Sequence, residues 1–260
     1  MKSTGTTLGV LALTLAVAGC GTSAGGGDRD GSAATGPSGT IRVFAASSLT
    51  GSFTELGKEF ETQYPGTTVQ FNFGASSDLA TQIDNGAPAD VFASASPTNM
   101  DQVVRAGDAR DPRPFAVNTM EIAVPPGNPG DVHRLADLAR TGTKVAVCQA
   151  QVPCGVVATK VFHNAGITVH PATEEVDVKS VLTKVSVGEV DAGVVYVTDV
   201  RAAGDQVRGI RISPSVNATT SYPIATVPAS ENVATARAFE RLVLSSQGRH
   251  VLAKAGFQEP

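Results

Sequence analysis

The sequence is poor in several residue types that mark common functions. Its 260 residues include no tryptophan, three cysteines and four histidines, and aromatic residues make up 5% of the chain. The formal net charge of −4 argues against nucleic acid or an anionic surface as a partner, because both attract basic proteins. After the N-terminal segment, no apolar run approaches the length of a membrane-spanning helix. With 42% hydrophobic and 17% charged residues, the composition is typical of a globular protein.

Motifs of the common enzyme classes are also missing. From Thr40 onward the chain has no G-x-S-x-G, G-x-G-x-x-G or Walker A motif. No two histidines have the spacing of four that places two metal ligands on one helix face. Three of them fall on predicted helices with polar neighbours, where we expect them to be solvated: His133, His163 and His250. Most acidic residues stand beside lysine or arginine, which is typical of solvated surface. We therefore predict a protein that is not an enzyme and has no cofactor.

The N-terminal segment indicates export. Lys2 is followed by an apolar run from Leu8 to Ala18, which is too short to span a bilayer and typical of a secretory signal. The ending "VAGC" resembles the lipobox of bacterial lipoproteins, in which the cysteine, here Cys20, becomes the lipid-modified N-terminus. An ordinary cleaved signal with a chance cysteine is the alternative. The prediction is a lipoprotein signal peptide over 1–20 and a protein held at the outer face of the cell membrane by lipid alone.

The next segment, residues 21–39, contains almost nothing apolar larger than alanine, so it cannot repay the entropy of ordering. It is predicted to be a flexible tether. Folded material then begins near Thr40, and two cysteines remain in it. An exported protein usually pairs such residues, so a disulfide between Cys148 and Cys154 is predicted, with two buried free thiols as the alternative. So short a loop contributes about 2 kcal/mol at best, and its main effect would be local shape.

Strand and helix patterns alternate along the body, which predicts parallel sheets covered by helices, that is, an α/β protein. Helices are expected, for example, over 51–64, 76–86, 96–107, 131–139, 155–166 and 178–189. Two strands with nearby proline and glycine, near 121–126 and 221–226, could cross between domains. This predicts two lobes: residues 40–122 plus 225–260 in the first and 123–224 in the second.

Serines cluster where strands give way to helices. Ser47 and Ser48 precede one amphipathic helix, and Ser76 and Ser77 precede the next. A helix N-terminus offers unpaired amide donors and a partial positive charge, and a serine adds a hydroxyl donor. Several such termini at the carboxyl edges of parallel sheets would form an anion site. Plain N-capping by serine is the alternative at each single position.

Four segments together resemble the molybdate-binding proteins of ABC transporters: "IRVFAASSLTGSF", "GASSDLATQIDNGAPADVFASAS", "VPCG" and "AGVVY". The resemblance covers about Thr40 to Phe257 and implies the two-lobed type II periplasmic-binding-protein fold. It implies an extracytoplasmic receptor that closes on molybdate or tungstate and delivers it to a membrane permease, as a monomer.

The family's ligand contacts fall on five positions of this sequence. The resemblance implies two serine hydroxyls, two backbone amides and one tyrosine hydroxyl, at Ser48, Ser76, Cys154, Val178 and Tyr196. Ser47 or Ser77 could replace its neighbour. At 154 the family more often has alanine, which is tolerable where only the N–H is used.

These groups are all uncharged donors, and that choice has chemical content. Molybdate and tungstate are fully deprotonated dianions at neutral pH and only accept hydrogen bonds. Phosphate usually carries a proton, and leaving that proton unpaired costs roughly 1–3 kcal/mol. Sulfate passes this test and could be rejected only by size, so a receptor for sulfate or another tetrahedral oxyanion stays open. A sensor or adhesion lipoprotein and a secreted hydrolase using Ser48 or Ser76 are the alternatives from other classes.

Overall fold

The computed structural model describes residues 36–260. The predicted signal peptide, Cys20 and most of the predicted tether lie outside these residues. The described residues form one nine-stranded sheet with the order β2-β1-β3-β9-β4-β7-β5-β6, and β8 pairs with β4. The strands are β1 (Gly39–Ala46), β2 (Thr67–Gly74), β3 (Val91–Ala93), β4 (Arg113–Val124), β5 (Val145–Cys148), β6 (Thr173–Glu175), β7 (Ala192–Tyr196), β8 (Arg208–Arg211) and β9 (Thr219–Thr226).

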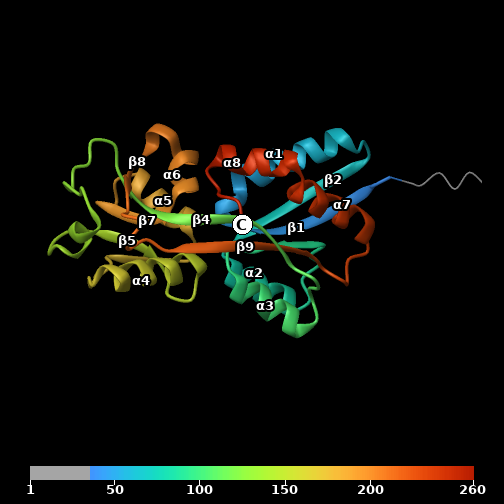
Figure 1. Ribbon diagram of the computed structural model, residues 1–260, viewed down its shortest axis with the longest axis horizontal. Helices are drawn as coiled ribbons and strands as arrows, with labels where there is room; N and C mark the ends of the chain where they lie inside the picture. Colours follow the sequence, from blue (N-terminus) through green and yellow to red (C-terminus); the bar gives the residue numbers. More distant parts are fainter. Residues whose placement is uncertain (1–35) are drawn as a thin grey trace, which may run out of the picture. The chain divides into compact units, whose positions relative to one another are not determined.

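Helices cover both faces of this sheet (Figure 1). They are η1 (Ser47–Leu49), α1 (Thr50–Gln63), α2 (Ser76–Asp84), α3 (Pro97–Ala106), η2 (Leu135–Ala139), α4 (Pro153–Ala165), α5 (Val178–Ser186), α6 (Val197–Ala203), η3 (Gly204–Gln206), α7 (Val233–Leu244) and α8 (Ser246–Ala255). The predicted α/β fold is confirmed: β1 runs parallel to β2 and β3, and β5 runs parallel to β6 and β7.

Strand β4 belongs to two halves of the sheet. It pairs with β9 from Arg113 to Thr119 and with β7 and β8 from Met120 onward. We call β1–β3 with α1, α2, α3, α7 and α8 the first half, and β5–β8 with α4, α5 and α6 the second half. Each half has its own buried apolar clusters. The lobe boundaries at 122/123 and 224/225 stay a prediction.

Helix α1 shows how the sequence builds the first half. Phe53, Leu56 and Phe60 recur at helical spacing and are fully buried. The ring of Phe239 on α7 lies 6.0 Å from that of Phe53 and 5.5 Å from that of Phe60. Gly57 lets α1 approach β2, because a Cβ there would lie 2.7 Å from a phenylalanine ring of that strand. The start of α1 is therefore fixed against the sheet.

The predicted helix over 131–139 is wrong, since only the 3₁₀ turn η2 forms there. The Asn128 side chain bonds both the N–H and the C=O of Val132, and the Asp137 carboxylate accepts the backbone N–H groups of His133 and Arg134. Such side-chain bonds compete with helical ones. His133 consequently lies on an exposed loop and not on a helix, 2.7 Å from the Asp131 carboxylate.

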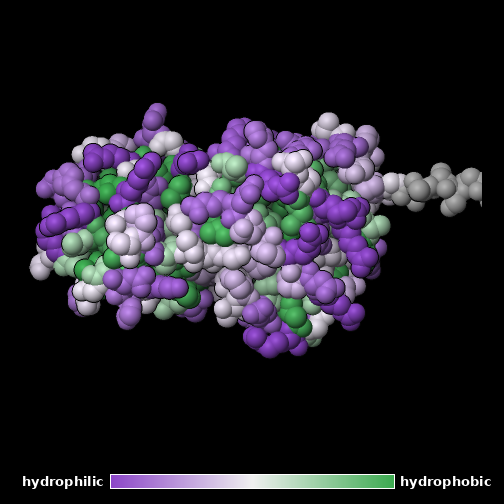
Figure 2. Space-filling model, in the orientation of Figure 1, coloured by the Kyte–Doolittle hydropathy of each residue, from purple (hydrophilic) through white to green (hydrophobic). Residues whose placement is uncertain are grey.

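Three short segments escaped the sequence patterns: β6, β8 and the first part of β4. Two are edge or near-edge strands of three or four residues rich in charge. The visible face of the molecule is mainly hydrophilic, with apolar residues in small patches (Figure 2). None of the helices within residues 36–260 has the length and apolar character to cross a membrane.

Candidate functional site

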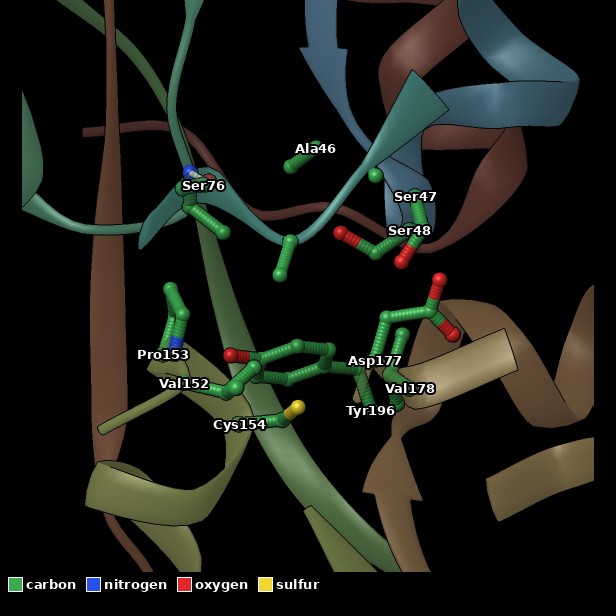
Figure 3. Close-up of a pocket in the computed structure, with 13 residues that line it drawn as sticks. Ala46, Ser47, Ser48, Ser76, Val152, Pro153, Cys154, Asp177, Val178 and Tyr196 are labelled. Carbon is green, nitrogen blue, oxygen red and sulfur yellow. Dashed lines mark hydrogen bonds between the residues drawn. The ribbon is translucent and has the colours of Figure 1, made fainter. Parts of the chain in front are cut away.

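A small cavity lies between the two halves, at the ends of strands and the beginnings of helices (Figure 3). Its volume is about 10 Å³, counted as space open to the centre of a water molecule, which is about the room for one water. The first half contributes the ends of β1 and β2 with the starts of η1 and α2. The second half contributes the starts of α4 and α5 and the end of β7. The five predicted ligand residues all line it: Ser48, Ser76, Cys154, Val178 and Tyr196.

Helix N-termini converge on this cavity. Turn η1 leads into α1, while α2, α4 and α5 begin at Ser76, Pro153 and Val178. The first amide groups of a helix have no partner within it and carry partial positive charge. This arrangement favours an anion by backbone geometry alone.

Ser48 and Ser76 do not serve as helix caps. The starts of η1, α1 and α2 have no side-chain cap, so the plain N-capping alternative is wrong for these two serines. Ser48 Oγ lies 2.9 Å from the Tyr222 hydroxyl. Ser76 Oγ accepts the N–H of Ala95 at 2.9 Å. The partner of Ser48 thus lies behind the cavity wall, whereas the partner of Ser76 is itself a lining residue.

Tyr196 presents a hydroxyl without a hydrogen-bond partner among the described residues. The residue is 1% exposed and lines the cavity from the end of β7. Its hydroxyl points toward Val152 and Pro153 in Figure 3. Burial, and after it the nearby Tyr222 hydroxyl, raise the pKa of Tyr196 well above its ordinary value, so the group keeps its proton. The Tyr222 hydroxyl does not meet hydrogen-bond geometry with it. A buried donor left unpaired is costly, and this one therefore calls for an acceptor in the cavity.

The start of α4 is shaped by a disulfide. Cys148 and Cys154 are bonded, with Cα atoms 5.7 Å apart, so the disulfide prediction is confirmed over the free-thiol alternative. Gly155 permits the tight turn, because a Cβ there would lie 2.0 Å from the Gln149 carbonyl oxygen. Pro153 is the first helical residue and brings no N–H. The Cys154 amide is thus the first N–H that α4 can offer.

The expectation of a lining made only of neutral donors is wrong at Asp177. This residue lines the cavity, and in Figure 3 its carboxylate lies on the side of Ser48. It caps α5 by accepting the Ser180 N–H at 2.8 Å, and aspartate is among the best residues for that role. The aspartate just before the amphipathic pattern of α5 is the signal that could have revealed it.

An ion pair between a buried carboxylate and a partly exposed lysine, close to Tyr196, was also missed from the sequence. Asp199 is 0% exposed, its Oδ1 lies 3.1 Å from Lys179 Nζ, and its Oδ2 accepts the Tyr196 N–H at 3.1 Å. Burial raises the pKa of Asp199, and Lys179 opposes that shift. The pair joins the start of α6 to α5, next to Val178. Acidic residues were expected on solvated faces, and Asp199 is an exception.

The site has no cluster of metal-ligating side chains. Within residues 36–260, no three His, Cys, Asp or Glu residues are grouped as they would be around a metal ion. Serine and tyrosine hydroxyls and backbone amides are instead donors that suit the oxygens of an anion. The five residues meet at one place, and their role in binding stays a prediction.

Known proteins that are similar to this chain bind solutes, according to their names. The family model described as bacterial extracellular solute-binding protein matches residues 41–258. The molybdate-binding protein ModA of Mycobacterium tuberculosis is 42% identical over 222 residues, which cover 85% of each chain. ModA of Escherichia coli is 29% identical over 234 residues, covering 84% of this chain and 89% of that protein.

Solved structures share the fold. The periplasmic molybdate-binding protein of Azotobacter vinelandii superposes with a TM-score of 0.75 at 21% identity, over 85% of this chain and 99% of that one. The sulfate-binding protein SubI of Mycobacterium tuberculosis gives the same TM-score at 19% identity, over 85% and 86%. At such identities the likeness concerns the fold alone, and it is equally strong for two different oxyanion binders.

Proposed function

The chain belongs to the bacterial extracellular solute-binding proteins, and we propose that its solute is molybdate, with tungstate bound almost equally well. The anion would be held by Ser48, Ser76 and Tyr196 through their hydroxyls and by Cys154 and Val178 through their backbone amides. The metal would have no direct protein ligand. The cavity has room for about one water, so a tetrahedral oxyanion would need the two halves slightly further apart than they are in this structure. Both halves supply contacts, so the ligand would stabilise a state in which they close on it.

The observation that carries this proposal is the Tyr196 hydroxyl. It is a buried, protonated donor without a partner in the described residues, and it lines a cavity on which several helix N-termini converge. A donor of this kind is satisfied by a ligand that accepts hydrogen bonds. Each bond to a charged acceptor contributes about 1.5–3 kcal/mol, and five such donors can offset the desolvation of a dianion.

The choice of molybdate over sulfate rests on the mycobacterial relative named for molybdate, which is 42% identical. We further propose an exported protein tethered through a lipid on Cys20, acting as a monomer that delivers its anion to an ABC permease. No enzymatic activity and no cofactor are part of this proposal.

Calorimetry with purified protein tests it, using molybdate, tungstate, sulfate and phosphate as ligands. A ligand that binds only the native state also adds about 2.7 kcal/mol to the free energy of unfolding at a concentration of 100 Kd. It therefore raises Tm as well. We expect molybdate and tungstate to bind tightly and alike, sulfate more weakly and phosphate weakest. Tighter binding of sulfate than of molybdate would favour the sulfate alternative, and mass spectrometry of the mature N-terminus decides the lipid.

A further inference from the structure

A chain of buried polar groups runs behind the cavity, between the two halves. The Tyr222 hydroxyl on β9 lies 2.9 Å from Ser48 Oγ. Asn118 Nδ2 on β4 lies 3.4 Å from that same Tyr222 oxygen and 2.9 Å from Thr198 Oγ1. All four residues are buried, and Thr198 is two positions after Tyr196. The chain therefore reaches from Ser48 in the first half to Thr198 at the start of α6 in the second half, through β9 and β4, which lie side by side in Figure 1.

The proton positions in this chain follow from its members. Asn118 Oδ1 accepts the Thr119 N–H at 3.0 Å, so its Nδ2 is the end that faces Tyr222, and an amide nitrogen only donates. The Tyr222 hydroxyl is fully buried, and burial raises its pKa, so it stays protonated. Of its two partners at hydrogen-bond geometry, Ser48 Oγ and Asn118 Nδ2, only Ser48 Oγ accepts. The Tyr196 hydroxyl lies near enough to influence the pKa of Tyr222 but does not meet hydrogen-bond geometry with it. Tyr222 consequently donates to Ser48, and the Ser48 proton is left free to point into the cavity.

The Ser76 hydroxyl is also held as a hydrogen-bond donor toward the cavity, by a different partner. Its oxygen accepts the backbone N–H of Ala95, so its own proton is also free for the ligand. A protonated oxygen placed against either serine would meet an oxygen that already accepts one hydrogen bond, and the serine proton would be aimed at it. An oxygen without a proton would find a donor at both.

We propose that Tyr222, oriented by Asn118, is a positioning residue that fixes Ser48 as a hydrogen-bond donor and so selects oxyanions that carry no proton. This inference rests on the proposed function and deepens it. Neither Tyr222 nor Asn118 lines the cavity, so the selection is set from behind the wall that touches the ligand. Buried chains of this kind also polarise one another, which strengthens the last donor.

A double-mutant cycle tests whether Tyr222 acts through Ser48. Calorimetry with molybdate compares wild type, Tyr222→Phe, Ser48→Ala and the double variant, with Tyr64→Phe as the control that removes a hydroxyl far from the cavity. We expect Tyr222→Phe to weaken binding about tenfold, Tyr64→Phe to change nothing, and Tyr222→Phe to add little once Ser48 is alanine. An equal loss in both backgrounds, or unchanged affinity of Tyr222→Phe, overturns the proposal.

A second variant tests the polarity itself and decides the matter should Tyr222→Phe fail to fold. In Asn118→Asp the carboxylate accepts the Tyr222 proton, so Ser48 must donate to Tyr222 and turn its lone pairs to the cavity. Sulfate and hydrogen phosphate, compared at mildly alkaline pH, carry the same charge and differ in one proton. Their affinity ratio therefore cancels the added negative charge. We expect the preference for sulfate over hydrogen phosphate to fall about tenfold, with the fold checked by the Tm of the ligand-free protein.

The two proposals fail in different ways. A wild type that binds none of these oxyanions removes the proposed function, and this inference with it. A wild type that binds molybdate, together with a folded Asn118→Asp that keeps the wild-type ratio of sulfate to hydrogen phosphate, removes this inference alone.

Discussion

The two walls of the cavity use different chemistry. In the first half the predicted contacts are the side-chain hydroxyls of Ser48 and Ser76, each hydrogen-bonded to another group of the protein. In the second half two of the three contacts are backbone amides, at Cys154 and Val178, and only Tyr196 uses a side chain. The first wall therefore depends on which residues are present, whereas the second depends mainly on where helices α4 and α5 begin. Substitutions should accordingly lower molybdate affinity most in the first wall and least at Cys154.

The largest effect is expected from removing both hydroxyls of the first wall. Ser48→Ala with Ser76→Ala deletes two bonds to a charged ligand, each contributing about 1.5–3 kcal/mol, so molybdate affinity should fall by at least about a hundredfold. Calorimetry measures it. Ser77→Ala, on the outer side of the same helical turn, is the matched control and should bind as wild type. Unchanged affinity in the double variant would remove both serines from the site.

Tyr196→Phe should lower molybdate affinity less, because only one donor is lost and the phenylalanine ring fills the same space. We expect a fall of about tenfold to a hundredfold by calorimetry. Since burial holds the pKa of Tyr196 well above that of an exposed tyrosine, its ionised form is disfavoured in the fold. Affinity in the wild type should therefore persist as pH rises through the range where exposed tyrosines ionise. Loss of binding within that range, present in wild type and absent in Tyr196→Phe, would contradict the assignment.

Asp177 differs from the other lining residues because its substitution is expected to raise molybdate affinity. Asp177→Asn removes a negative charge beside a dianion and keeps an oxygen that caps α5. Molybdate affinity should rise several-fold. Asp177→Ala removes charge and cap together, so its α5 should be less stable. Weaker binding by Asp177→Asn would show that the carboxylate orients donors in the lining.

The smallest effect on binding is expected at the disulfide. Cys148→Ala with Cys154→Ala keeps the backbone N–H at 154, so affinity should change only a few-fold. Stability should fall by about 2 kcal/mol at most, which denaturant unfolding measures. A loss of binding as large as that of Tyr196→Phe would mean that the disulfide, and not the helix start alone, places the amide.

Local pattern predicted most of the fold and the serines that line the cavity, whereas the full set of five predicted ligand residues, Tyr196 above all, came from the family resemblance. Helices such as α1 and α5 follow from their apolar spacing, and the serines stand at junctions visible in the sequence. The polar groups behind the site could not be predicted in that way. Tyr222 reaches Ser48 because β3 pairs with both β1 and β9, and Asn118 reaches Tyr222 because β4 pairs with β9 across about a hundred residues of chain. No local pattern carries that register. The predicted helix over 131–139 does not form, because the side chains of Asn128 and Asp137 hydrogen-bond the backbone there in place of helical bonds.

Strands β4 and β9 connect the halves, and they are hydrogen-bonded to each other over most of their length. Two separate loops would let the halves slide, twist and part in any direction. A paired ribbon bends far more readily across its flat face than within its plane. Any opening of this molecule should therefore be a hinge rotation about the paired strands, with the anion leaving on the side opposite the hinge.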